Sequence, residues 1–221
     1  MPRKPRFFLP HVPVHVVQRG NNRQAVFFDD GDYRAYLKWL REGCERYGCE
    51  IHAYVLMTNH IHLLASPQEK DSISRLLQHV GRRYVPYINH TYGRTGTLWE
   101  GRFKASLVRE ERYLLTCCRY IELNPVRAQM VQRPEMYRWS SYRCNALGAA
   151  DPVVRPHELY LALGTDDAKR RRAYYELFRS HIEEQELEGI RSCLQTGTPL
   201  GNDQFREQIE QALQVKVGQT R

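Results

Sequence analysis

The chain has 221 residues, of which 42% are hydrophobic and 26% charged, with a formal net charge of +8. That length suits one domain with an extension or two small domains, and the hydrophobic content excludes a wholly disordered chain. No apolar run approaches the roughly 20 residues that a bilayer-spanning helix needs, and the basic residues 1–6 lead into no signal-peptide pattern. Six cysteines without a Cys-x-x-Cys pair favour reduced thiols, so we expect a cytoplasmic protein with no membrane partner.

The positive charge is concentrated in the first two-thirds of the chain. Residues 1–150 carry 23 Lys and Arg against 13 Asp and Glu, whereas residues 151–221 carry 10 against 12. A basic region rich in aromatic residues indicates a polyanionic partner, most often a nucleic acid. A merely basic protein fits the charge equally well, so the charge alone leaves both open.

The first half of the chain alternates strand and helix signals. Residues 12–19 are rich in β-branched side chains and stop at a turn cluster, which predicts a strand. From Asp29 the pattern changes: the apolar residues recur every three or four positions, which predicts a helix that is capped by Asp30 or Asp32 and ends near Gly48. Residues 50–57 and 61–66 are two further predicted strands, and the short link between them favours an antiparallel hairpin.

A second helix is predicted from Asp71 to near Pro86 or a little later, then a glycine-rich loop, a strand over 103–108 and a helix over 110–123. The first six elements match the split βαβ order of a ferredoxin-like α+β fold. We therefore expect an antiparallel sheet with helices packed on it, whose second face is free for a ligand or for the third helix.

The remaining 151–221 segment has a different character. Residues 159–164 and 168–187 are predicted as short helices of mixed charge, and a last helix begins at Asp203. We therefore expect a domain over residues 1–150 followed by a helical extension over 151–221.

His60-Ile61-His62 is the strongest local motif. Alternate side chains of a strand point to the same face, so the two imidazoles project together and offer two nitrogen ligands to a metal ion. Such short matches are also common among half-exposed strand histidines.

Tyr120 and Asn124 strengthen the prediction of a metal site, because residues four apart share one helix face. A phenol is a poor nucleophile near neutral pH but a cation beside it would help, and the Asn124 amide oxygen suits Mg²⁺ or Mn²⁺.

Five stretches together resemble the single-tyrosine HUH transposases, most closely the REP-associated tyrosine transposases of bacteria. HUH denotes His, hydrophobic, His, here His60-Ile61-His62 within MTNHIHLL. The other stretches are VQRGNNR at 17–23 with Phe27-Phe28 after it, GTLWEGRFK at 96–104, YIELNPVRA at 120–128 and WSSY at 139–142. Their common order and spacing over roughly residues 7–145 is far more specific than any one of them.

The resemblance implies a metal-dependent single-strand DNA nuclease and strand transferase. Tyr120 would attack a phosphodiester beside a DNA hairpin, giving a 5′-phosphotyrosine and a free 3′-hydroxyl, while His60, His62 and Asn124 would hold Mg²⁺ or Mn²⁺. The natural substrates of such proteins are short palindromic repeats that fold into hairpins. A monomer is favoured, although relatives in insertion sequences exchange their tyrosine helices in dimers.

Several basic and amide side chains suit contacts to DNA phosphates and bases. These candidates are Arg3, Lys4, Arg6, Arg19, Asn21, Asn22, Arg23, Arg82, Arg83, Arg102 and Lys104.

Two other classes of function remain open. The ferredoxin-like sheet also serves as an RNA-recognition scaffold, so the chain could be a hairpin-binding or single-strand-binding module without chemistry. A small metallohydrolase, in which a metal-bound water attacks, would make Tyr120 incidental. The joint occurrence of His60, His62, Tyr120 and Asn124 favours the tyrosine nuclease.

Overall fold

The protein is described here from a computed structural model that places residues 6, 8–214 and 216–217. Its strands are β1 (Val14–Arg19), β2 (Cys49–Met57), β3 (His60–Pro67) and β4 (Lys104–Leu107). The helices before β4 are η1 (Asn21–Arg23), α1 (Asp30–Tyr47) and α2 (Ser72–Thr91). The later ones are α3 (Glu110–Glu122), α4 (Asn124–Arg127), η2 (Pro134–Met136), α5 (Tyr142–Leu147), α6 (Glu158–Leu161), α7 (Asp167–Leu177), α8 (Glu184–Thr196) and α9 (Asp203–Leu213).

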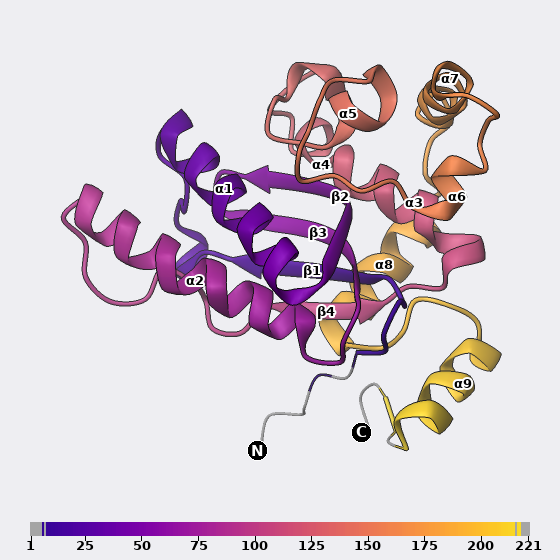
Figure 1. The fold of residues 1–221 in the computed structure, drawn as a ribbon, viewed down its shortest axis with the longest axis horizontal. Helices are drawn as coiled ribbons and strands as arrows, with labels where there is room; N and C mark the ends of the chain where they lie inside the picture. The colour runs from indigo at the N-terminus through magenta and orange to yellow at the C-terminus, as the bar shows by residue number, and fades with distance from the viewer. Residues whose placement is uncertain (1–5, 7, 215, 218–221) are drawn as a thin grey trace.

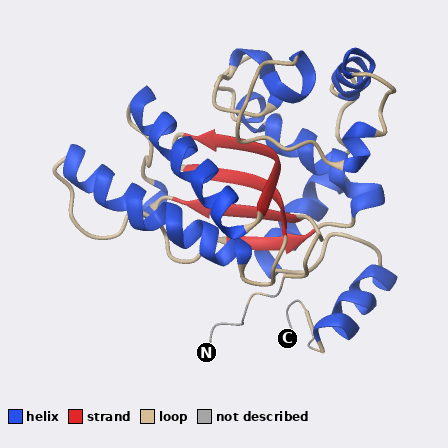
Figure 2. Ribbon diagram, viewed as in Figure 1, coloured by secondary structure: helices blue, strands red, loops and turns tan. Residues whose placement is uncertain are grey.

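The four strands form one antiparallel sheet in the order β2-β3-β1-β4. This is the predicted ferredoxin-like arrangement, and the α+β fold with a helical C-terminal region is confirmed. Figure 2 shows the sheet with helices on both sides. α1 and α2 pack together on one face (Figure 1), whereas α3 and α8 contact the strands from the other. None of the helices in the described part of the chain is long and apolar enough to cross a membrane.

The register of β1 against β3 decides which side chains share a face. Val17 lies opposite His62 and Arg19 opposite His60. Because side chains alternate along a strand, His15, Val17 and Arg19 face the same side as His60 and His62. The neighbouring β4 adds Lys104, which pairs with Val17. The face that α1 and α2 leave uncovered therefore carries both histidines of the motif.

Helix α1 has the predicted end, but its N-cap is Asp29 rather than the predicted Asp30 or Asp32. The Asp29 side chain accepts a hydrogen bond from the Gly31 amide, and Asp29 and Asp32 form a reciprocal capping box. The helix ends at Gly48, whose φ of 62° is a conformation that glycine adopts without strain.

Helix α2 runs further than an end at Pro86, because it continues through this proline to Thr91. Ile88, beyond the proline, is fully buried, so packing offsets the lost hydrogen bond.

The 151–221 segment contains more helix breaks than predicted. The single helix expected over 168–187 is wrong: α7 ends at Leu177 and α8 begins at Glu184. Phe178 follows α7 and packs against Tyr142 and Tyr174, and Ser180 accepts a hydrogen bond from Arg119 on α3. Beyond α8, Leu200 hydrogen-bonds to the backbone of Leu107 and Arg109 at the end of β4. These tertiary contacts override the continuous helical pattern.

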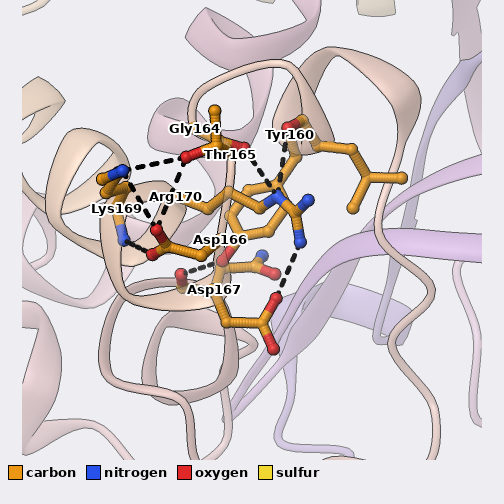
Figure 3. A network of polar contacts seen from close by, with 9 residues as sticks. Tyr160, Gly164, Thr165, Asp166, Asp167, Lys169 and Arg170 are labelled. Carbon is orange, nitrogen blue, oxygen red and sulfur yellow. Dashed lines mark hydrogen bonds and ion pairs between the residues drawn. The ribbon is translucent and has the colours of Figure 1, made fainter.

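The start of α7 is a local polar network (Figure 3). Asp166 caps the helix by accepting from the Lys169 amide, and Lys169 Nζ lies 3.2 Å from an Asp166 oxygen. Arg170 donates to the Gly164 carbonyl and forms an ion pair with Asp167 at 2.7 Å. Two of the basic residues of α7 are thus matched by acidic residues of the same turn.

Glu122 connects the tyrosine-bearing helix α3 to α5 and α7. Its fully buried carboxylate accepts hydrogen bonds from Ser141 at 2.5 Å, Asn145 at 2.9 Å and Tyr174 at 2.8 Å. Burial raises the pKa of Glu122 to about 7, although these three donors oppose the shift. A carboxyl whose folded pKa exceeds its ordinary value favours folding in its neutral form.

We predict that Glu122 makes the fold less stable as the pH rises. The contribution of neutral Glu122 to the free energy of unfolding is fully present below the ordinary pKa of 4.5 and is lost as the pH rises through about 7. At about 1.4 kcal/mol per pKa unit, this loss is roughly 3 kcal/mol. Urea unfolding at a series of pH values should show that Glu122→Gln removes this part of the pH dependence. The exposed control Glu188→Gln should leave it unchanged. An identical pH profile for Glu122→Gln and wild type would contradict the prediction.

Candidate active site

A cavity of about 390 Å³ opens on the sheet face that α1 and α2 leave uncovered. Its wall combines residues from β1, β3, β4, the loop before β4, the α3–α4 junction and α8. Those residues are Val17, Arg19, His60, His62, Glu100, Gly101, Arg102, Lys104, Tyr120, Asn124, Arg191, Leu194 and Gln195. The four residues predicted to carry the chemistry therefore line one cavity.

The Tyr120 ring stands edge-on to the histidines. Its centroid lies 5.9 Å from that of His62 and 5.6 Å from that of His15, with the planes inclined by 68° and 72°. His60 and His62 are 5.1 Å apart between centroids. Tyr120 and His62 are largely buried, whereas His60 is half-buried at the cavity.

Each imidazole of the motif has its Nδ1 atom occupied by a polar partner. His60 Nδ1 lies 2.6 Å from Asn59 Oδ1, and the Asn59 amide nitrogen donates to the Arg23 carbonyl, which sets the amide orientation. His60 Nδ1 must then be the donor, which leaves Nε2 with a free lone pair. His62 Nδ1 lies 2.9 Å from His15 Nε2, so its Nε2 is likewise the nitrogen that could bind a metal.

Burial holds these histidines in their neutral form. It lowers the pKa of His60 to about 4, with a further contribution from the charge of Arg19. Burial also lowers the pKa of His62 well below its ordinary value, and that of His15 to about 3. Neutral imidazoles near neutral pH are the form that binds a cation.

Asn124 follows Tyr120 on a separate short helix. The predicted helix over 110–123 ends one residue earlier, at Glu122, and Asn124 begins α4. Its amide nitrogen donates to the carbonyls of Tyr120 at 3.1 Å and Ile121 at 3.2 Å. That orientation leaves Oδ1 as the atom that could bind a metal. Within the described residues no group of three or more His, Cys, Asp or Glu could hold a metal ion.

The sequence matches the family model described as "Transposase IS200 like" over residues 9–124, just over half of the chain. The chain belongs to the IS200-like transposase family. Its fold is similar to that of a REP-associated tyrosine transposase solved bound to a REP hairpin, with a TM-score of 0.57 and 18% identity over 71% of this chain and 93% of that one. A putative transposase from Deinococcus radiodurans matches with a TM-score of 0.39 and 24% identity over 54% and 95%. No curated protein matches the chain at a significant level.

Some predicted DNA-binding residues of this IS200-like transposase lie at the cavity and others do not. Arg19, Arg102 and Lys104 line it. Asn21, Asn22 and Arg23 form the η1 turn directly after β1. Arg82 and Arg83 are exposed on α2, and α2 covers the opposite face of the sheet. Contacts of all these residues to DNA stay predictions.

The N-terminal arm is only partly described. Arg3 and Lys4 lie outside the described residues. Arg6 packs on the protein, because its guanidinium lies 3.9 Å from the Phe103 ring centroid and donates to the Phe103 carbonyl. Phe103 follows Arg102 in the chain, so Arg6 lies close to one wall of the cavity.

Several residues around the site were not among those predicted from the sequence. His15 contacts His62 and Tyr120, and its Nδ1 lies 3.8 Å from Cys117 Sγ. Arg127 places its guanidinium 4.3 Å from the Tyr120 ring centroid. Arg191 and Gln195 reach the cavity from α8. The alternation His15, Val17, Arg19 on a strand could have indicated His15, but only the register against β3 brings it to His62.

We predict that His60 and His62 bind Mn²⁺ together. Titration calorimetry with Mn²⁺ alone should show that His60→Ala and His62→Ala each weaken binding by more than about tenfold, because each removes one nitrogen ligand. The exposed His90→Ala on α2 is the matched control and should bind as wild type. Unchanged affinity in either site variant would contradict the assignment.

We predict that His15 raises the affinity for Mn²⁺ without binding the cation itself. With a metal at Nε2, His62 carries its proton on Nδ1 and donates it to His15 Nε2, which fixes the orientation of the ring. We expect His15→Ala to lower Mn²⁺ affinity by about 10- to 100-fold, with the circular dichroism spectrum retained. An affinity equal to that of wild type would show that the His15–His62 contact does not orient the ligand.

Proposed function

We propose that this IS200-like transposase is a metal-dependent single-strand DNA endonuclease and strand transferase of the REP-associated type, which acts beside DNA hairpins through a 5′-phosphotyrosine. One observation carries the proposal: Tyr120 lies in the same cavity as His60 and His62, with its ring edge-on to His62 at 5.9 Å. A phenol beside two neutral imidazoles is the combination that a tyrosine nucleophile with a bound cation requires.

The reaction needs no external energy source. The Tyr120 oxygen forms a bond to the phosphorus of a phosphodiester and gives up its proton to solvent, and the bond from phosphorus to the 3′-oxygen breaks. The departing 3′-oxygen takes up a proton and becomes a 3′-hydroxyl. In strand transfer another 3′-hydroxyl attacks the phosphotyrosine, and the tyrosine oxygen leaves and regains its proton. The number of phosphoester bonds is conserved in each step.

His60, His62 and Asn124 would hold the divalent cation. Two neutral imidazoles with free Nε2 atoms and one amide oxygen make a plausible donor set, and its nitrogen content fits Mn²⁺ better than Mg²⁺. When bound, the cation withdraws charge from the phosphate oxygens and so lowers the barrier to attack. The described residues offer no carboxylate cluster for such an ion, which argues against a carboxylate-based metallohydrolase.

Arg127 supports the nucleophile. Burial lowers its pKa to about 10, so the guanidinium remains charged near neutral pH. It lies 4.3 Å from the Tyr120 ring centroid and donates to the Tyr120 carbonyl. A positive charge beside the ring stabilises the negative charge that the phenol oxygen carries once it has lost its proton, before its bond to phosphorus forms.

Hairpin DNA is the proposed partner. Arg19, Arg102 and Lys104 surround the cavity and can neutralise phosphates of a single strand that enters it. The similar REP-associated transposase was solved bound to a REP hairpin. Because Tyr120, His60 and His62 of one chain line the same cavity, the proposed chemistry needs no second subunit, and a monomer is the proposed active form.

Tyr120→Phe tests the proposal. Wild type incubated with a labelled DNA hairpin carrying single-stranded flanks and Mn²⁺ should give a covalent adduct on a denaturing gel. Tyr120→Phe should abolish the adduct while its affinity for the hairpin stays within about twofold, because affinity comes mainly from phosphate contacts. The exposed Tyr175→Phe is the matched control and should react as wild type.

Other outcomes would exclude the proposal. Cleavage by Tyr120→Phe without an adduct would indicate attack by water. Binding by wild type without cleavage or adduct would indicate a hairpin-binding module.

A further inference from the structure

An exposed aromatic pair lies where the first residues of α1 meet the end of α2. Phe28 is 44% exposed, although large hydrophobic side chains are usually buried. Its ring centroid lies 4.5 Å from that of Tyr92, and the guanidinium of Arg94 is 5.6 Å from the Phe28 centroid. We refer to Phe28, Tyr92 and Arg94 as the aromatic platform. No residue of this platform lines the cavity described above.

One buried carboxylate holds the two rings in place. Asp32 is fully buried and accepts hydrogen bonds from the Phe28 amide at 2.8 Å and the Tyr92 hydroxyl at 2.9 Å. It also accepts from the Asp29 amide and the Tyr87 hydroxyl, both at 3.0 Å. A platform fixed in this way loses little conformational entropy when a flat ligand stacks on it.

The backbone also fixes Arg94. Gly93, with a φ of 59°, turns the chain after α2, and the Arg94 amide donates to the Asn89 carbonyl at 2.8 Å. The nearby carboxylates are already engaged. Asp29 caps Gly31, and Asp30 pairs with Arg34 and Arg138. Asp30 is thus paired with two arginines, whereas Asp29 and Asp32 accept hydrogen bonds from amides and hydroxyls. Arg94 is the cation that contacts the exposed Phe28 ring, and it offers a partner to a ligand with a π-face and a negative charge.

The platform is connected to the cavity by two short stretches of backbone. The loop that follows Tyr92 continues to Glu100, Gly101 and Arg102 in the cavity wall. On the other side, the Phe27 amide donates to the Thr58 carbonyl in the turn just before His60. In Figure 1 the start of α1 and the end of α2 lie at one end of the sheet, the end at which β1 also finishes. Both connections lead from the cavity to this end of the sheet, which is the direction that a strand would take from the cavity to the platform.

We propose that the aromatic platform binds an unpaired nucleobase of the single strand that flanks the hairpin. The base stacks on Phe28, and Arg94 pairs with an adjacent phosphate. Base stacking on an aromatic side chain tolerates any base, so the platform contributes affinity for single-stranded flanks rather than sequence choice. This inference rests on the proposed function because it takes DNA as the ligand.

Two DNA probes and two substitutions test it. The first probe is a hairpin with single-stranded flanks, with 2-aminopurine placed at successive flank positions, and the second is the same hairpin with a flush end. Phe28→Ala should weaken binding of the flanked hairpin by roughly 5- to 150-fold and leave the flush hairpin unchanged. At one position 2-aminopurine should be quenched on binding wild type and not on binding Phe28→Ala. Phe28→Trp should keep both the affinity and the quenching.

The controls separate this inference from misfolding and from failure of the proposed function. Met136→Ala removes a side chain of similar exposure, 51%, and should bind both probes as wild type. If Phe28→Ala binds the flanked hairpin with the same affinity as wild type, the proposal that a base stacks on Phe28 is wrong, even if wild type forms the Tyr120 adduct. The exposed aromatic surface would then be a candidate contact for another protein. An equal loss for both probes would also overturn the proposal. If wild type forms no adduct while the flank-specific loss is present, the proposed chemistry fails and the platform stands.

Discussion

The antiparallel register between β1 and β3 is the constraint on which the site depends. It places Val17 opposite His62 and Arg19 opposite His60, so His15, His60 and His62 share the face on which Tyr120 packs. A shift by one residue would turn β1 to the other face and separate His15 from His62. Gly20 helps to hold this register, because a Cβ there would lie 2.2 Å from the Gln24 carbonyl oxygen and would push apart the turn that follows β1.

Local patterns were sufficient to predict much of the fold. The C-terminal end of α1 at Gly48, the β2–β3 hairpin and the order of the first six elements follow from short-range rules, and the structure has them. The misplaced boundaries lie where tertiary packing overrides propensity. α2 continues through Pro86 because Ile88 is buried, and the 168–187 segment breaks because Phe178 and Ser180 contact other helices.

The residues of the candidate site also fall into two groups, those that the sequence predicts and those that only the packing reveals. His60, His62, Tyr120 and Asn124 were predicted from spacing and resemblance, and the structure brings them to one cavity. His15, Arg127 and Arg191 could not be predicted, because each reaches the site through strand register, through the break between α3 and α4, or through the course of the chain after residue 150. Sequence periodicity carries information about one element, whereas a site built from six segments depends on their packing.

The 151–221 segment forms part of the cavity wall, although its net charge is close to zero. Its acidic residues balance its basic ones, and Lys169 and Arg170 on α7 pair with Asp166 and Asp167. α8 nevertheless contacts β1 and β4 and carries Arg191, Leu194 and Gln195 into the cavity wall. The hydrogen bonds of Leu200 to Leu107 and Arg109 hold the end of this helix against β4. The segment therefore supplies part of the wall of the cavity that holds Tyr120, and the proposed contacts to phosphates rest on Arg19, Arg102 and Lys104 from β1, β4 and the loop before β4.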